Sequence, residues 1–156
     1  MSGTTKKGTG RDEIQNGFVR FAMLFIMTYK KMKNGIIYNR FRCMNAWYNV
    51  HAFGDIDFLS YDTYLMTISF DENCVNPNFL GCRIVFYNYV GTTTQKQMTC
   101  FINDFCGVQY VKYYKKARYL LRKNQGDYAV LYRDKYTEKY IAEIKNYSRT
   151  IKKVIL

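Results

Sequence analysis

The sequence contains a single histidine, His51, and no two cysteines spaced Cys-x-x-Cys. Structural zinc sites need about four Cys or His ligands, usually arranged as two close pairs. The sequence therefore argues against a metal site, and it reveals no partner through which the lone histidine would act as a general base. We expect no cofactor, and reduced thiols of the kind found in a reducing cytosol. The cysteines concerned are Cys43, Cys74, Cys82, Cys100 and Cys106.

Long apolar runs are also missing. The apolar stretch 18–27, interrupted only by Arg20, spans ten residues, and a bilayer requires about twice that length. The chain opens with the polar segment MSGTTKKGTG, which has neither the apolar centre of a signal peptide nor the spacing of a phosphate-binding loop. We therefore expect an intracellular protein without a membrane span.

The acidic residues in the middle of the chain complete no catalytic motif. Asp55 and Asp57 would share one face of a strand, but a metal-dependent nuclease needs carboxylates that converge on one or two cations. Asp62 and Asp71 add no recognisable spacing. The threonines at 92–94 could suggest a nucleophile, yet the capping of a helix explains them fully. We expect the protein not to be an enzyme.

The charges are distributed unevenly, with 24 Lys and Arg against 12 Asp and Glu and a net charge of +12. Residues 1–50 carry nine cations and two acids, residues 51–110 carry two cations and six acids, and residues 111–156 carry thirteen cations and four acids. Basic ends around an acidic middle predict a fold with one basic face. Such a face attracts polyanions at long range, and more weakly as the salt concentration rises.

Aromatic residues are abundant, with 16 Tyr and 11 Phe. In the segment KYYKKARYLLRK (112–123) they alternate with cations, which neutralise phosphates, while their rings can stack on unpaired bases. A solvated strand with its tyrosines in the core explains this segment equally well. The second basic cluster, at 30–42, makes nucleic-acid binding the favoured interpretation. The predicted binding residues are Lys30, Lys31, Lys33, Arg40, Arg42, Lys112, Tyr113, Tyr114, Lys115, Lys116, Arg118, Arg122 and Lys123.

Hydrophobic periodicity predicts an α+β fold. Helical spacing is expected over 12–33, 94–106 and from 134 to the end, and strands over 36–53, 61–70, 83–90, 108–114 with 117–121, and 128–132. In the second helix one apolar stripe contains Met98, Phe101, Ile102 and Phe105, and Gly107 ends it. We predict a flexible basic tail over 1–11 and a single domain over 12–156, with a mainly antiparallel sheet and flanking helices.

A short pattern runs through residues 60–120. The strands YDTYLMTISF and RIVFYNYV precede Thr93, Thr94 and Lys96 on a short helix, and Gly107-Val108 and KKARYLL follow it. In this pattern the chain resembles a group of small proteins encoded by tailed bacteriophages, from which it departs by a longer hairpin loop and an added C-terminal helix. The resemblance implies a small α+β fold, an origin in a mobile element and no catalytic residues. The expected location is the cytoplasm of the host cell or the virion.

Two functional hypotheses remain. The first is a nucleic-acid-binding accessory protein, for which DNA and RNA, single or double stranded, fit equally. The second is a protein-binding module with an acidic partner: an inhibitor of a host defence or of a nucleic-acid enzyme, or a small virion component. Inhibitors that mimic a polyanion are acidic, so the charge favours the first hypothesis. A contiguous basic groove lined with tyrosines would support it further, whereas dispersed charge with a flat aromatic patch would support the second.

Overall fold

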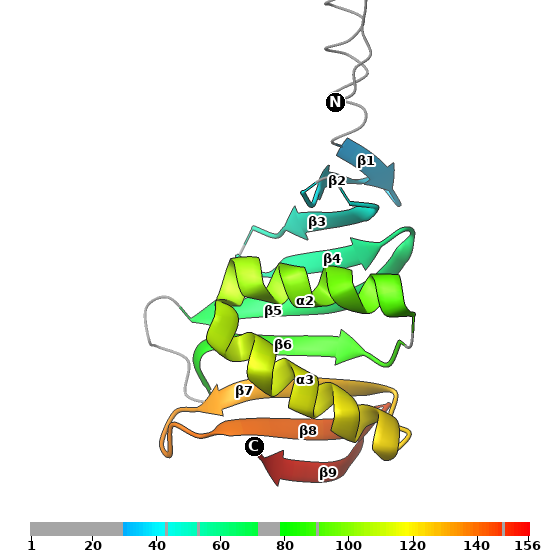
Figure 1. Ribbon diagram of the computed structural model, residues 1–156. Coiled ribbons are helices and arrows are strands. Elements are labelled where there is room, and N and C mark those ends of the chain that lie inside the picture. The colour runs from blue at the N-terminus through cyan, green and yellow to red at the C-terminus, as the bar shows by residue number, and fades with distance from the viewer. Residues whose placement is uncertain (1–29, 43, 53, 72–78, 90, 148) are drawn as a thin grey trace, which may run out of the picture.

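The structure is a computed structural model that describes residues 30–42, 44–52, 54–71, 79–89, 91–147 and 149–156. Within these ranges one antiparallel sheet contains nine strands, whose spatial order is their order in the chain (Figure 1). The strands are β1 (Lys30–Lys33), β2 (Ile36–Arg40), β3 (Ala46–Val50), β4 (Ile56–Ser60), β5 (Thr63–Asp71), β6 (Phe79–Tyr87), β7 (Tyr128–Asp134), β8 (Tyr140–Asn146) and β9 (Arg149–Ile155). Helices α2 (Thr92–Cys106) and α3 (Val108–Lys123) follow β6. The predicted antiparallel sheet with helices is confirmed.

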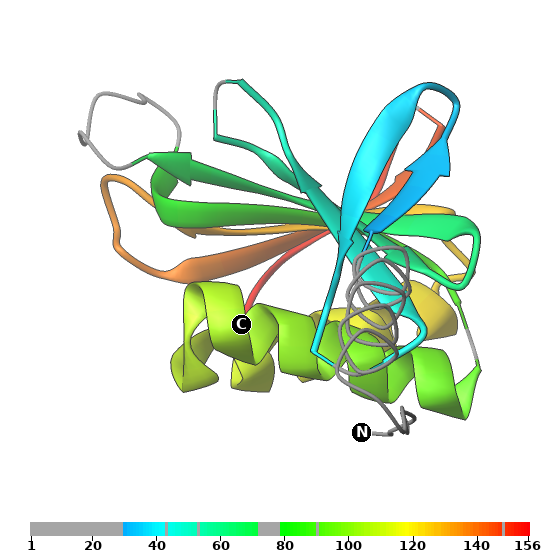
Figure 2. The same cartoon turned by 90° about the horizontal axis from the view of Figure 1, so that it is seen from above.

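Both described helices lie on the same side of the twisted sheet (Figure 2). We call this side the covered face and the opposite side the open face. Because successive residues of a strand point to opposite faces, each strand contributes to both. On β4, for example, Phe58 contacts α2 and Asp57 lies on the open face; on β6, Phe86 contacts α3 and Tyr87 lies on the open face. The helices thus flank the sheet on one side only.

The core lies between the covered face and the helices. The Phe58 and Phe101 rings are 4.3 Å apart, and the Phe86 ring meets Tyr114 edge-on at 4.9 Å. The predicted stripe of α2 is confirmed: its first three residues are at most 1 % exposed, and Phe105 packs against them. Full burial of such a side chain contributes about 1.5–3 kcal/mol, so this layer is the main source of stability.

The start of α2 is held by a buried polar contact and not by the predicted side-chain cap. The residue before the helix is Gly91, and no side chain caps the first turn. Thr94 and Gln97 point into the core, where Ser60 Oγ lies 2.9 Å from Thr94 Oγ1 and donates to Gln97 Oε1 at 2.5 Å. Because these groups are removed from water, their mutual hydrogen bonds are needed to offset the cost of burial.

The segment after Gly107 is the helix α3, so the strands predicted over 108–114 and 117–121 are wrong. Gly107 has φ = 100°, which lets the chain reverse between the two helices at little steric cost. The buried residues of α3 are spaced i, i+4, i+7 and i+11, as one helix face requires. They are Tyr110, Tyr114, Ala117 and Leu121.

Lys30–Lys33 form a strand and not the last turn of a helix. Asn34 and Gly35 have φ values of 52° and 76°, which is the geometry of a two-residue hairpin turn, and Lys33 pairs with Ile36 across it. The Asn-Gly pair therefore starts a hairpin where we predicted a helix stop. The rest of the predicted helix, 12–29, and the predicted tail, 1–11, lie outside the described residues.

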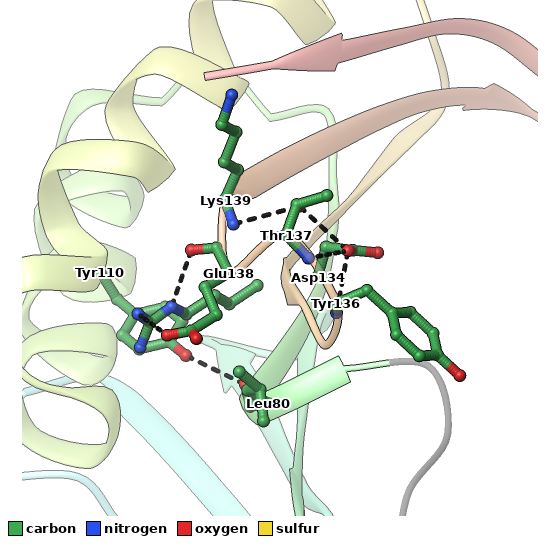
Figure 3. A network of polar contacts seen from close by, with 8 residues as sticks. Leu80, Tyr110, Asp134, Tyr136, Thr137, Glu138 and Lys139 are labelled. Atoms are coloured by element: carbon green, nitrogen blue, oxygen red, sulfur yellow. Dashed lines mark hydrogen bonds and ion pairs between the residues drawn. The ribbon is translucent and has the colours of Figure 1, made fainter.

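The C-terminal segment is a hairpin, β8 and β9, so the predicted terminal helix is also wrong. Asp134 organises the turn before β8: its Oδ2 accepts hydrogen bonds from the backbone N–H groups of Tyr136 and Thr137 at 3.1 and 2.8 Å (Figure 3). These bonds hold the pKa of Asp134 below its usual value. A carboxylate that accepts backbone N–H groups in this way favours a turn over a helix interior.

Candidate functional site

The outward side of α3 presents a cluster of exposed positive charges. Four lysines and one tyrosine on this side are exposed, and α3 contains no Asp or Glu. None of the four lysines forms an ion pair with a carboxylate of the described residues. We call this surface the α3 lysine face. Its members are Lys112, Lys115, Lys116, Tyr119 and Lys123.

The three tyrosines of the basic segment differ in environment. Tyr114 is 0 % exposed, and burial raises its pKa. Tyr113 is stacked on Tyr140, with the ring centres 3.9 Å apart and the planes 10° from parallel. Tyr119 is 64 % exposed. The prediction that Tyr114 stacks on a base therefore fails, because its ring is in the core, and Tyr119 is the ring of α3 that a ligand can reach.

The two arginines of α3 turn towards the body of the protein. The Arg118 guanidinium lies 5.4 Å from the centre of the Tyr114 ring, and Arg122 Nη2 donates to the Tyr89 carbonyl at 3.3 Å. Arg122 also lies in the last turn of the helix, where a cation is favourable to the helix dipole. We infer that both arginines help to hold α3 in place, which leaves the lysines as the accessible cations.

The N-terminal basic cluster surrounds the only tryptophan of the chain. Lys31 Nζ and the Arg40 guanidinium lie 5.5 and 5.7 Å from the centre of the Trp47 ring. Lys31 also pairs with Asp62, which lowers the pKa of that carboxyl group, and Lys33 donates to the Asp62 carbonyl. These side chains lie on the open face, and Lys30 is exposed on the same strand.

Arg42 departs from the rest of this cluster. It donates from Nε and Nη2 to the two carboxylate oxygens of Asp104 on α2, at 2.8 and 2.5 Å. The structure therefore brings Lys31, Lys33 and Arg40 to one face of the sheet and the lysines of α3 to the other. The expected single basic face is not formed by the described residues, because the sheet separates the two clusters.

The thiols and the histidine have ordinary structural partners. Cys82, Cys100 and Cys106 are free thiols, and the hydrogen bond between Cys82 and Cys106, together with burial, raises the pKa of Cys106. His51 Nε2 lies 2.5 Å from Asp57 Oδ2, and Thr67 donates to the other oxygen of that carboxylate at 2.6 Å. The described residues contain no group of three or more potential metal ligands. Cys43 and Cys74 lie outside them.

A row of tyrosines lies on the open face and was not predicted from the sequence. Tyr64, Tyr87 and Tyr128 lie on the adjacent strands β5, β6 and β7, with ring centres 5.7 and 5.9 Å apart along the row. We call these three residues the tyrosine row. They alternate with core residues along their strands, so the signal was present in the period-2 pattern. It could be read only with the strand pairing known.

No protein-family model, curated protein or solved structure matches this chain. The described part of the chain also has no helix of the length and apolarity that a bilayer crossing demands. Function must therefore be inferred from the chain's own residues.

Proposed function

We propose that the protein is a non-enzymatic nucleic-acid-binding accessory protein of a phage or another mobile element, and that the α3 lysine face is its phosphate-binding surface. The observation that carries this proposal is the presence of four exposed lysines, without described ion-pair partners, on a helix that lacks acidic residues. The resemblance to tailed-bacteriophage proteins supports the assignment of origin.

The geometry of α3 suits contacts to several phosphates at once. Lys112 and Lys123 are eleven residues apart, which is about 16 Å along a helix at 1.5 Å per residue. Lysine contacts phosphates as a flexible point charge, and such contacts position a protein without reading sequence. We therefore expect weak sequence preference and a strong dependence on salt.

The neighbouring edge strand, β9, adds further cations to this positive surface. The register pairs Lys152 of β9 with Ile144 of β8 and Arg149 with Asn146. Ile144 is buried under the helices, so strand alternation places Lys152 and Arg149 on the covered side, beside α3. These exposed cations enlarge the positive surface beyond the helix.

A protein partner is the second candidate. The separation of the two basic clusters by the sheet, and the row of tyrosines on the open face, are features that a protein-binding module would also have. Exposed tyrosines are enriched in the centres of such interfaces. A partner of this kind would need an acidic surface.

The test is the salt dependence of affinity in a variant with Lys112, Lys115, Lys116 and Lys123 replaced by Ala. Each lysine that contacts a phosphate contributes about 0.7–0.9 to the slope of log affinity against log salt. The slope should therefore flatten by up to about three to four units. The matched control replaces the same four residues by Arg, which keeps every charge on the helix and should keep the slope.

A wild-type slope in the alanine variant would show that α3 does not contact the phosphates. The proposed surface would then be wrong even if nucleic acid binds elsewhere. Thermal unfolding of both variants should match the wild type, because the four side chains are exposed.

A further inference from the structure

The open face carries a line of aromatic and cationic side chains that crosses the sheet with one interruption, at β4. The register pairs Arg40 with Trp47 and Tyr128 with Lys145, at the two ends of this line. Between Trp47 and the tyrosine row the paired residue is Leu59, opposite both Trp47 and Tyr64. The line from β3 to β7 therefore consists of aromatic rings interrupted at β4 by Leu59, which is 1 % exposed, with a cation at each end.

The tyrosine row is available to a ligand. Tyr64 is 43 % exposed and Tyr87 is 41 % exposed. Both rings are therefore partly accessible to solvent, although both residues lie on a broad sheet. Both described helices are on the opposite side of the sheet (Figure 2), so neither helix covers these rings. Thr67 fixes the position of Tyr64, because the Tyr64 hydroxyl hydrogen-bonds to Thr67 Oγ1, which in turn donates to Asp57.

Next to the row, the open face is hollowed over β6–β9. The hollow has a volume of about 440 Å³, and Arg83, Lys145 and Lys153 line it from three different strands. Glu143 lies 3.7 Å from Lys145 and accepts a hydrogen bond from Tyr132 at 2.7 Å. The hollow therefore combines three cations with the carboxylates of Asp134 and Glu143, and its Lys145 pairs with Tyr128 across β7 and β8.

This arrangement matches the two chemical parts of an unpaired nucleic-acid strand. Bases stack on aromatic rings whatever their sequence, and the phosphates between them need cations beside the rings. On the open face the rings stand in a line, with cations at its β2 end and in the hollow at its other end. A duplex keeps its bases paired and stacked inside, so it can use the cations but not the rings.

We propose that the open face binds single-stranded nucleic acid, with bases on the tyrosine row and phosphates on Arg83, Lys145 and Lys153. This inference rests on the proposed function and deepens it, because it assigns strand preference to a surface other than the α3 lysine face. The α3 lysine face then supplies affinity for any phosphate backbone, and the open face supplies preference for unpaired strands.

The test compares a labelled oligothymidine with a labelled duplex of equal length, using Tyr87→Ala and Tyr128→Ala. Removing one stacked ring should weaken single-strand binding by about 5- to 150-fold and leave duplex binding and the salt slope unchanged. Tyr87→Phe keeps the ring and should bind like the wild type. Lys153→Ala should instead lower the salt slope for the single strand by about one unit.

Trp47 supplies a second readout, because it is the only tryptophan and lies in line with the row. Its emission should change when the single strand binds and stay constant when the duplex binds to α3. Unchanged affinity in both alanine variants would overturn the open-face site and leave the α3 proposal standing. Equal losses for single strand and duplex would also overturn it. Failure of the wild type to bind either oligonucleotide would overturn both proposals.

Discussion

The two faces of the sheet use the same residue type for opposite purposes. On the covered face Tyr114 is 0 % exposed and packs edge-on against Phe86. Tyr87 follows Phe86 on β6 and lies on the open face, where it is 41 % exposed and contacts two other tyrosines. An aromatic surplus in the composition therefore divides into a core layer and an exposed row. Only the position of each residue on its strand or helix distinguishes the two.

The cationic side chains are also divided between the two sides of the sheet. The lysines of α3 point away from the covered face, whereas Lys31 and Arg40 lie over Trp47 on the open face. The outermost described strands, β1 and β9, also carry lysines, which protect exposed strand edges from pairing with other chains. A basic cluster on an edge strand thus has a structural reason of its own, and α3, which is no strand edge, is the stronger functional candidate.

The largest expected effect is the loss of a ring from the covered face. Tyr114→Ala should lower the free energy of unfolding by about 3–5 kcal/mol, because it opens a cavity under α3. Tyr114→Phe removes the contacts of the hydroxyl to the Met98 sulfur at 3.7 Å and to Arg118 and should cost about 0.5–1.5 kcal/mol. Denaturant unfolding measures both changes. A wild-type value for the alanine variant would mean that this ring is not in the core.

The buried polar contact under α2 should have the next largest effect. Ser60→Ala leaves Gln97 Oε1 and Thr94 Oγ1 without the partner they have in the described structure. An unsatisfied buried polar group costs about 1–3 kcal/mol, and denaturant unfolding should show a loss in this range. The double variant Ser60→Ala with Gln97→Leu should recover part of it, since both members of the Ser60–Gln97 hydrogen bond are then removed and only Thr94 keeps its hydroxyl. No recovery would argue against a direct bond.

On the open face the same type of change should be mild. Tyr87→Ala removes cross-strand ring contacts, which contribute about 0.2–1 kcal/mol in a sheet. The free energy of unfolding should fall by no more than this, in contrast to Tyr114→Ala. A loss as large as that of Tyr114→Ala would place Tyr87 in a second core, and the distinction between the two faces would fail.

The smallest effect should come from Asp134, in the turn between β7 and β8. Because the folded pKa of Asp134 is below its ordinary value, its carboxylate stabilises the fold above the unfolded pKa of about 3.9, and this contribution is lost as the pH falls through the folded pKa. Asp134→Ala should therefore lower Tm slightly at pH 7, and the gap to the wild type should narrow in acid. A gap that is constant with pH would contradict this role.

Local patterns predicted some elements well. The stripe of α2, the strands near 61–70, 83–90 and 128–132, and the turn at Gly107 follow from periodicity and from glycine's backbone freedom. Two of the wrong predictions could have been avoided from local patterns. Asn34-Gly35 is a strong hairpin signal, and the i, i+4, i+7, i+11 spacing of the residues that are buried in α3 fits a helix.

The remaining errors depend on contacts between distant segments. The alternation of Tyr140, Ala142 and Ile144 fits a strand once α3 covers them, yet Tyr140, Ile141, Ile144 and Tyr147 also suit one side of a helix. The tyrosine row joins positions up to 64 residues apart, and only the strand register brings them together. The predicted site residues on α3 could be found from the sequence, whereas their separation from Lys31 and Arg40 by the sheet could not.

Nucleic-acid binding is tested most directly by titrating labelled single-stranded and duplex oligonucleotides with the wild-type protein near physiological salt, and again at higher salt. The account predicts saturable binding with a dissociation constant in the range of roughly 1–100 µM, weakened strongly as salt rises, and tighter for the single strand. Absence of binding to both at the upper end of this range would contradict it and favour a protein partner.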